Sequence, residues 1–137
     1  AGGDPVIVHD AARPLARTAL FERALADLEQ YGCDAAIAAA PVSDTIKQVA
    51  DDGRTVQSTL DRARLWAVQT PQVFRRAALE RALAAPPELV AAATDDAWLI
   101  ERAGGVVRVV QSDPGNLKVT TLTDLHVAEL LLRERGA

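Results

Sequence analysis

Short, continuous apolar runs alternate with longer amphipathic stretches along most of this chain. The runs "VIVH" at 6–9 and "AAIAAAPV" at 35–42 have the pattern of strands buried on both faces. Between them, "ALFERALADLEQYG" at 19–32 places its apolar residues on one helical face, with Thr18 as the expected N-cap and Gly32 at the end. Strand alternating with helix predicts an α/β sheet with right-handed crossovers.

The rest of the chain continues this alternation, with one interruption. Residues 45–60, "TIKQVADDGRTVQSTL", alternate around the turn "DDGR" and predict a two-stranded hairpin, which we place in an insertion spanning 42–66. Thr94 is expected to cap a helix over 95–104, because Asp95 and Asp96 favour its first turn. Further strands are predicted at 65–74, 106–111 and 116–120, and further helices at 75–84 and 122–135.

Composition limits the class of protein. The chain has 137 residues, 49% hydrophobic and 25% charged, which is enough for one domain with a core. We find no run of about 18 apolar residues and no signal peptide, so no membrane association is expected. Cys33 is the single cysteine, without a Cys or His cluster for zinc, and we expect it to be a small core or near-surface residue in a cytoplasmic protein.

The net charge of −4 argues against general nucleic-acid binding, because the 15 Lys and Arg residues are scattered among acids. A small anionic ligand is still compatible with this composition, since a few well-placed cations suffice to bind one. The charge pattern therefore directs attention to individual polar residues at the ends of strands.

Acidic and basic residues follow the first predicted strand directly. In open α/β sheets ligands bind beyond the carboxyl ends of the strands, so Asp10 could hold a metal ion or sugar hydroxyls, and Arg13 could bind a phosphate. The alternative is structural, with Asp10 capping a turn and Arg13 pairing with it. His9 alternates away from Asp10 along the strand, and we expect a half-buried structural histidine.

Three other polar groups stand at predicted element ends. They are "SDTIK" after the second strand, "TDD" at a helix start, and Lys118 within "NLKVT". Lys118 either extends to solvent or, if its strand is internal, requires an anion. Asp61 and Arg62 of the hairpin could form only a solvated ion pair.

Taken in order, "VHDAARP", "APVSDTIK", "LDRARLWAVQTPQVF", "TDDA" and "NLKVTTLTDL" resemble the 2-C-methyl-D-erythritol 4-phosphate cytidylyltransferase family. The resemblance implies transfer of CMP from CTP to methylerythritol phosphate with Mg²⁺ and release of pyrophosphate, a step of non-mevalonate isoprenoid synthesis. It also implies a homodimer with a doubly wound, Rossmann-like nucleotidyltransferase sheet, whose hairpin is a dimerisation arm.

The resemblance assigns a role to each matching residue. Asp10 and Arg13 would bind substrate, with Asp10 also close to the metal and the ribose. Thr94 would contact substrate, and Lys118 would be the catalytic residue that stabilises charge on the reacting phosphates. Thr45 and Arg62 would lie on the arm and bind methylerythritol phosphate in the neighbouring subunit.

The resemblance also has gaps. The family's glycine-rich triphosphate loop does not occur here, so we expect residues 1–137 to be the C-terminal part of a single nucleotidyltransferase domain, inactive alone, with about 90 residues upstream. Trp98 stands where the family usually has a small residue such as serine. Two alternatives stay open, namely a cytidylyltransferase for another polyol phosphate such as ribitol 5-phosphate, and a non-catalytic dimerisation fragment.

Overall fold

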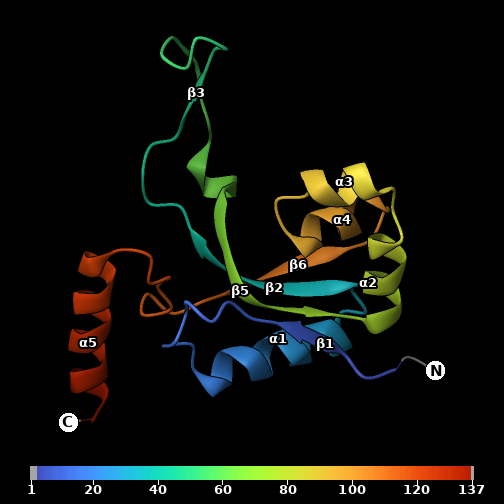
Figure 1. The fold of residues 1–137 in the computed structure, drawn as a ribbon, viewed down its shortest axis with the longest axis horizontal. Coiled ribbons are helices and arrows are strands. Elements are labelled where there is room, and N and C mark those ends of the chain that lie inside the picture. The colour runs from blue at the N-terminus through green and yellow to red at the C-terminus, as the bar shows by residue number, and fades with distance from the viewer. Residues whose placement is uncertain (1–2, 137) are drawn as a thin grey trace.

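The structure is a computed structural model that describes residues 3–136. Its main sheet has four strands in the order β1-β5-β2-β6, built from β1 (Val6–Val8), β5 (Trp66–Phe74), β2 (Ala35–Pro41) and β6 (Val107–Gln111). β2 and β6 are parallel, whereas β5 runs antiparallel to both β1 and β2. The predicted α/β sheet is therefore confirmed, and its one antiparallel strand makes it mixed (Figure 1).

Helices cover both faces of this sheet, and β2 shows why the chain folds this way. Its alternate residues Ala36 and Ala38 pack in the core on the side of α1 (Thr18–Gln30). Ala35 and Ile37 point to the other face and pack in the core formed with α2 (Arg76–Leu83) and α4 (Asp96–Arg102). Because side chains alternate along a strand, one alanine-rich run supplies two cores while leaving room for helices on both sides.

Two expectations for the N-terminal elements were wrong. Within residues 3–136, β1 is an edge strand and is not buried on both faces, and Ile7 is 42% exposed. Thr18 does not cap α1, because it is the first helical residue, and Arg17 takes the N-cap position without a side-chain hydrogen bond.

Cys33 lies buried in the core beside α1, where burial raises the pKa of its thiol.

The predicted hairpin is present, and it projects away from the sheet (Figure 1). Its strands β3 (Lys47–Val49) and β4 (Val56–Thr59) pair only with each other. Asp52 orders the turn by accepting hydrogen bonds from the backbone N–H groups of Arg54 and Thr55, both at 2.8 Å, and Gly53 adopts a positive φ of 69°. The short 3₁₀ helix η1 (Arg62–Arg64) leads back into β5.

The C-terminal half differs from expectation in three places. The segment 116–120 is not a strand, because its backbone bonds to a loop instead of a strand neighbour. A helix that we did not predict, α3 (Pro87–Ala92), begins at the proline pair 86–87, since proline fits the first turn of a helix. The predicted closing helix, α5 (Leu122–Gly136), is present but buries only Ala128 among its residues 122–136.

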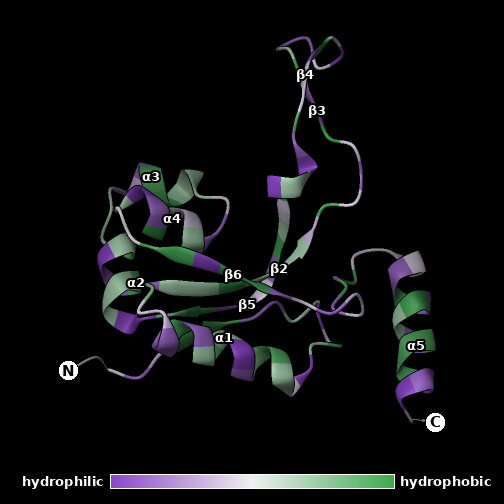
Figure 2. Cartoon of the chain, turned by 180° about the vertical axis from the view of Figure 1, so that it is seen from behind, coloured by the Kyte–Doolittle hydropathy of each residue, from purple (hydrophilic) through white to green (hydrophobic). Residues whose placement is uncertain are grey.

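Helix α5 stands apart from the sheet and displays several apolar residues on its surface (Figure 2). Leu122 is 76% exposed, and Leu125, Val127, Leu130 and Leu132 are also exposed. Among the described residues, no helix combines the length and apolar character needed to cross a membrane.

Candidate active site

A cleft of about 450 Å³ lies where β1, β2 and β6 reach their carboxyl ends. This is the place where α/β sheets bind ligands. The structure brings four residues from the sequence prediction into this cleft, namely Asp10, Arg13, Thr94 and Lys118. The other lining residues are Ile37, Val68, Gln69, Thr70, Gln72, Asp95, Trp98 and Glu101.

One carboxylate lies between two cations on the cleft wall. Asp10 Oδ2 is 3.3 Å from Lys118 Nζ and 3.5 Å from Arg13 Nε. Arg13 is buried, and this burial lowers the pKa of its guanidinium, while the neighbouring Asp10 opposes the shift. The Lys118 side chain is 48% exposed, so its ammonium can reach a ligand in the cleft. The two cations thus mark the side of the cleft that suits an anionic group, whereas the carboxylates of Asp95 and Glu101 also line the cleft.

Lys118 reaches Asp10 because two loops are joined by hydrogen bonds. The N–H of Val119 donates to the carbonyl of Ala12 at 2.7 Å, and Arg13 Nη1 donates to the carbonyl of Asn116 at 2.7 Å. Asn116 is only 2% exposed, and its Nδ2 donates to the Thr70 carbonyl at 2.9 Å. The segment around Lys118 is thus irregular but anchored at both of its ends.

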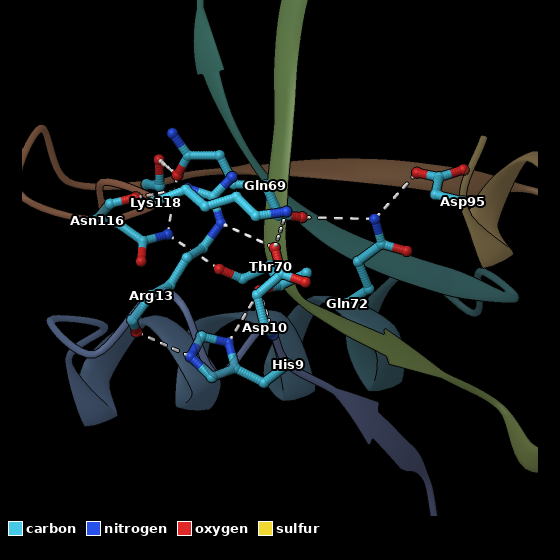
Figure 3. Close-up of polar contacts among 10 residues, drawn as sticks. His9, Asp10, Arg13, Gln69, Thr70, Gln72, Asp95, Asn116 and Lys118 are labelled. Atoms are coloured by element: carbon cyan, nitrogen blue, oxygen red, sulfur yellow. Dashed lines mark hydrogen bonds and ion pairs between the residues drawn. The ribbon is translucent and has the colours of Figure 1, made fainter. Parts of the chain in front are cut away.

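The loop after β1 is anchored to β5 as well (Figure 3). The N–H of Asp10 donates to the hydroxyl of Thr70 at 2.9 Å, and the same hydroxyl lies 3.0 Å from Nδ1 of His9. His9 is half-buried and packs edge-on against Phe21, with ring centroids 5.1 Å apart. This placement agrees with the structural role expected for His9.

The start of α4 forms the opposite wall of the cleft. Asp95, and not Thr94 as expected, is the N-cap, because its Oδ1 accepts a hydrogen bond from the N–H of Trp98 at 2.8 Å. Asp95 Oδ2 accepts a second hydrogen bond from Gln72 Nε2 at 3.0 Å, which links α4 to β5 (Figure 3). Thr94 is exposed and remains free to face a ligand. The ring of Trp98 packs against the guanidinium of Arg102, 5.0 Å from its centroid.

Sequence reasoning missed the polar residues that hold these walls together. Gln69, Thr70 and Gln72 lie in a strand that is otherwise apolar, and Asn116 lies in the loop that follows β6. A signal was available, because polar side chains in a buried strand must find hydrogen-bond partners. Gln69 Oε1, for example, accepts from both Ser112 Oγ at 2.7 Å and Asn116 Nδ2 at 2.8 Å.

The two predicted arm residues lie elsewhere. Thr45 and Arg62 are not among the described residues that line the cleft. Both are exposed, and Arg62 Nη1 donates to the carbonyl of Ser43 within the arm. Asp61 caps η1 by accepting from the N–H of Ala63 at 3.1 Å, and no Asp61–Arg62 ion pair occurs within residues 3–136.

Within residues 3–136, no group of three His, Cys, Asp or Glu side chains could hold a metal ion by itself. Asp10, Asp95 and Glu101 all contribute carboxylates to the cleft lining, and Asp10 is the one that pairs with Arg13 and Lys118. Mg²⁺ is commonly held by one or two carboxylates together with substrate phosphates. The cleft therefore fits a Mg²⁺ ion that arrives with a phosphorylated ligand.

A mixed sheet covered by helices on both faces, with this charged cleft at its strand ends, is a Rossmann-like arrangement, and the solved structures that share it identify a nucleotidyltransferase fold. Two solved structures carry the same architecture. The 2-C-methyl-D-erythritol 4-phosphate cytidylyltransferase of Thermus thermophilus is 34% identical with a TM-score of 0.80, over 97% of this chain and 64% of that one. The enzyme of that name from Francisella tularensis is 35% identical with a TM-score of 0.83, over 95% and 60%.

The family model for 2-C-methyl-D-erythritol 4-phosphate cytidylyltransferase matches residues 1–134, and the chain belongs to this family. A relative of that name from Synechococcus elongatus is 49% identical over 98% of this chain and 56% of its own length. Another, from Symbiobacterium thermophilum, is 50% identical over 96% of this chain and 54% of its own length. The chain thus spans little more than half the length of these relatives.

Proposed function

We propose that this chain forms part of an enzyme that transfers CMP from CTP to 2-C-methyl-D-erythritol 4-phosphate and releases pyrophosphate. The observation that carries the proposal is the cleft in which Asp10 lies between Arg13 and Lys118, in a chain of this family. Because the chain spans 56% of a relative's length, the proposal concerns a protein that also contains the remaining part.

The reaction requires charge stabilisation more than proton transfer. An oxygen of the methylerythritol phosphate attacks the α-phosphorus of CTP, a new P–O bond forms, and the bond to the pyrophosphate leaving group breaks. The attacking phosphate is already an anion, so no general base is required. Lys118, whose ammonium is exposed to the cleft, stabilises the negative charge that the phosphates share in the transition state.

Asp10 and Arg13 have complementary roles in binding. Arg13 is buried and fixed by Asn116, so its guanidinium offers a positioned donor to a phosphate with little entropic cost. The Asp10 carboxylate orients both cations and can accept hydrogen bonds from ribose or polyol hydroxyls. Asp10 is also the residue that would hold Mg²⁺, which supplies electrostatic stabilisation to the triphosphate. Thr94 contacts substrate from the start of α4.

The arm supports a homodimer in which each hairpin completes the neighbouring site. It projects from the sheet and exposes apolar side chains of Val49, Val56 and Leu60. Exposed apolar side chains on a projecting hairpin favour burial against another chain. In such a dimer Thr45 and Arg62 bind the methylerythritol phosphate of the partner. The insertion 42–66 is then a dimerisation element, and the protein is cytoplasmic.

The activity is tested with the full-length protein, purified and supplied with CTP and Mg²⁺. Mass spectrometry of the product separates methylerythritol phosphate from ribitol 5-phosphate as acceptors. We expect cytidine-diphosphate methylerythritol at the higher kcat/KM. A higher kcat/KM for ribitol 5-phosphate would contradict the proposed substrate, and CTP binding without product from either acceptor would contradict the enzyme activity.

A further inference from the structure

The loop that carries Lys118 is tied to the main sheet by one amide side chain of β5. Gln69 Oε1 accepts a hydrogen bond from Asn116 Nδ2 at 2.8 Å (Figure 3). The same oxygen accepts a second hydrogen bond from Ser112 Oγ at 2.7 Å. Ser112 follows β6 directly, and Asn116 lies two residues before Lys118. Gln69 therefore joins the two ends of the segment 112–116 from the side of β5.

A backbone carbonyl fixes the orientation of both amides. A carbonyl oxygen can only accept, so the Asn116 atom that lies 2.9 Å from the carbonyl of Thr70 must be Nδ2. The same Nδ2 contacts Gln69, so the Gln69 atom that faces it must be the acceptor Oε1. The Ser112 hydroxyl then donates to Oε1 as well. None of these side chains titrates, so the arrangement does not depend on a protonation state.

The position of the Lys118 ammonium depends on the backbone that carries it. Among the described residues, the side chain of Lys118 pairs only with Asp10, and it is 48% exposed. An ion pair at this exposure does little to order a long side chain. The backbone on the far side of Lys118 is held by the N–H of Val119, which donates to the carbonyl of Ala12 at 2.7 Å. The backbone on the near side is held through Asn116.

We propose that Gln69 is a positioning residue that holds the segment 116–119 in place, so that Lys118 reaches the reacting phosphates. Gln69 belongs to β5, which lies between β1 and β2, so the anchor is attached to an interior strand of the sheet. The inference rests on the proposed function and adds to it that kcat depends on a residue that acts through Lys118. Small misplacements of a group that stabilises the transition state are costly to the rate.

The anchoring is tested without substrate, by amide hydrogen exchange on the 137-residue chain. Gln69→Met keeps the length of the side chain and removes the acceptor. The protection factor of the Val119 N–H should then fall about tenfold, the effect of two lost hydrogen bonds on local opening. Gln69→Glu keeps acceptor oxygens for both donors and should stay within about threefold of wild type.

The N–H of Arg75 is the control for general destabilisation, because it donates to the carbonyl of Asp34 at 2.9 Å just beyond the other end of β5. Its protection should not change in either variant. Unchanged protection of Val119 in Gln69→Met, or an equal loss at Arg75, would overturn the proposal, whether or not the full-length protein transfers CMP.

The consequence for catalysis is tested in the full-length protein. We expect Gln69→Met to lower kcat about tenfold, because Lys118 is displaced from the reacting phosphates. KM for CTP and for methylerythritol phosphate should change less than about threefold, since the binding groups remain. Gln30→Met, at an exposed position of α1, is the matched control and should leave kcat unchanged. A higher KM at unchanged kcat would overturn the proposal, because Gln69 would then bind substrate itself.

A double-mutant cycle tests whether Gln69 acts through Lys118. Adding Gln69→Met to Lys118→Ala should lower kcat by no more than about twofold, and independent losses that multiply would overturn the proposal. If Gln69→Met does not fold, Ser112→Ala removes one of the two donors and should give smaller losses, about threefold, in the same two measurements. No CMP transfer by the wild-type protein would instead contradict the proposed function, and hydrogen exchange would still decide whether Gln69 holds the segment.

Discussion

Asp10 is the residue on which the electrostatics of the cleft depend. Its Oδ2 lies 3.3 Å from Lys118 and 3.5 Å from Arg13, and its side chain is 36% exposed. Ion pairs at this level of exposure typically contribute about 0–1 kcal/mol to stability. The pair between Asp10 and the exposed Lys118 is therefore better explained by ligand binding than by folding, and substitution of Lys118 should affect activity far more than stability.

Replacing Lys118 by Ala in the full-length protein is expected to lower kcat by roughly two to three orders of magnitude, the loss seen when one preorganised charge-stabilising group is removed. Steady-state pyrophosphate release measures the rate. The melting temperature should change little, as it should for Arg81→Ala on the exposed side of α2, which is the activity control. An unchanged rate would mean that Lys118 only extends to solvent.

For Asn116 we expect the opposite, a loss of stability on substitution, because its side chain is buried. Asn116→Ala removes the donor to the buried Thr70 carbonyl and to Gln69, of which Gln69 keeps its hydrogen bond from Ser112. Urea unfolding of the 137-residue chain should show a loss of about 1–3 kcal/mol. Exposed Thr94→Ala is the matched control and should fall within about 0.5 kcal/mol of wild type. A loss no larger than that control would mean that water replaces the Asn116 amide at no cost.

At the scale of elements, polar side chains cap the starts of two helices, α4 and α5. Helix α5 starts with a capping box, in which Thr121 Oγ1 accepts from the N–H of Asp124 at 3.1 Å and Asp124 Oδ2 accepts from the N–H of Thr121 at 2.8 Å. Hydrogen bonds to its carboxylate, first from the N–H of Thr120 and then from Thr121, lower the pKa of Asp124 to about 2. The carboxylate thus favours the folded form only while it is ionised.

The pH dependence follows from this lowered pKa. The Asp124 contribution is fully present above the ordinary pKa of 3.8 and is lost as the pH falls through about 2. Asp124→Asn should therefore lower the free energy of urea unfolding at pH 6, and the difference from wild type should shrink toward pH 2. Asp44→Asn, at an exposed position of the arm, controls for general acid effects. A difference that stays constant between pH 6 and pH 2 would rule out the ionised cap as its cause.

Much of the element order could be predicted from periodicity, and the failures have physical causes. The hairpin and helices α1 and α2 follow their apolar patterns, and α5 forms at the predicted place although it buries only Ala128 among residues 122–136. Alternation does not encode strand direction, so the antiparallel run of β5 was not predicted. The segment 116–120 alternates like a strand, yet its partner is the loop after β1. In the site, Asp10 and Lys118 lie side by side because the segment 116–120 pairs with the loop after β1. No local sequence pattern indicates this pairing.

At the scale of the whole molecule, the sheet carries one part of the proposed site and the arm carries another. If Arg62 serves the partner's site and Lys118 its own, the Arg62→Ala and Lys118→Ala homodimers should both be nearly inactive. Mixing and subunit exchange form roughly half mixed dimers, each with one site that is intact. About a quarter of wild-type activity should then return, by the two-fold symmetry of the dimer.

Native mass spectrometry provides the control for this experiment, because it reports the fraction of mixed dimers directly. Exchange confirmed by mass, with activity still at the level of the separate mutants, would contradict the shared site. Arg62 would then be a residue that only stabilises the arm through the Ser43 carbonyl.

The central claim is that residues 1–137 hold the cleft for the phosphorylated acceptor, while the rest of the family's length supplies the triphosphate-binding part. Pyrophosphate release from CTP and methylerythritol phosphate, measured side by side for the 137-residue chain and the full-length protein, tests this claim most directly. We expect release by the full-length protein and none by the chain alone, because the proposal assigns the backbone donors for the triphosphate to the part of the relatives' length that the chain does not span. Release by the chain alone at a comparable rate, or no release by the full-length protein, would contradict the claim.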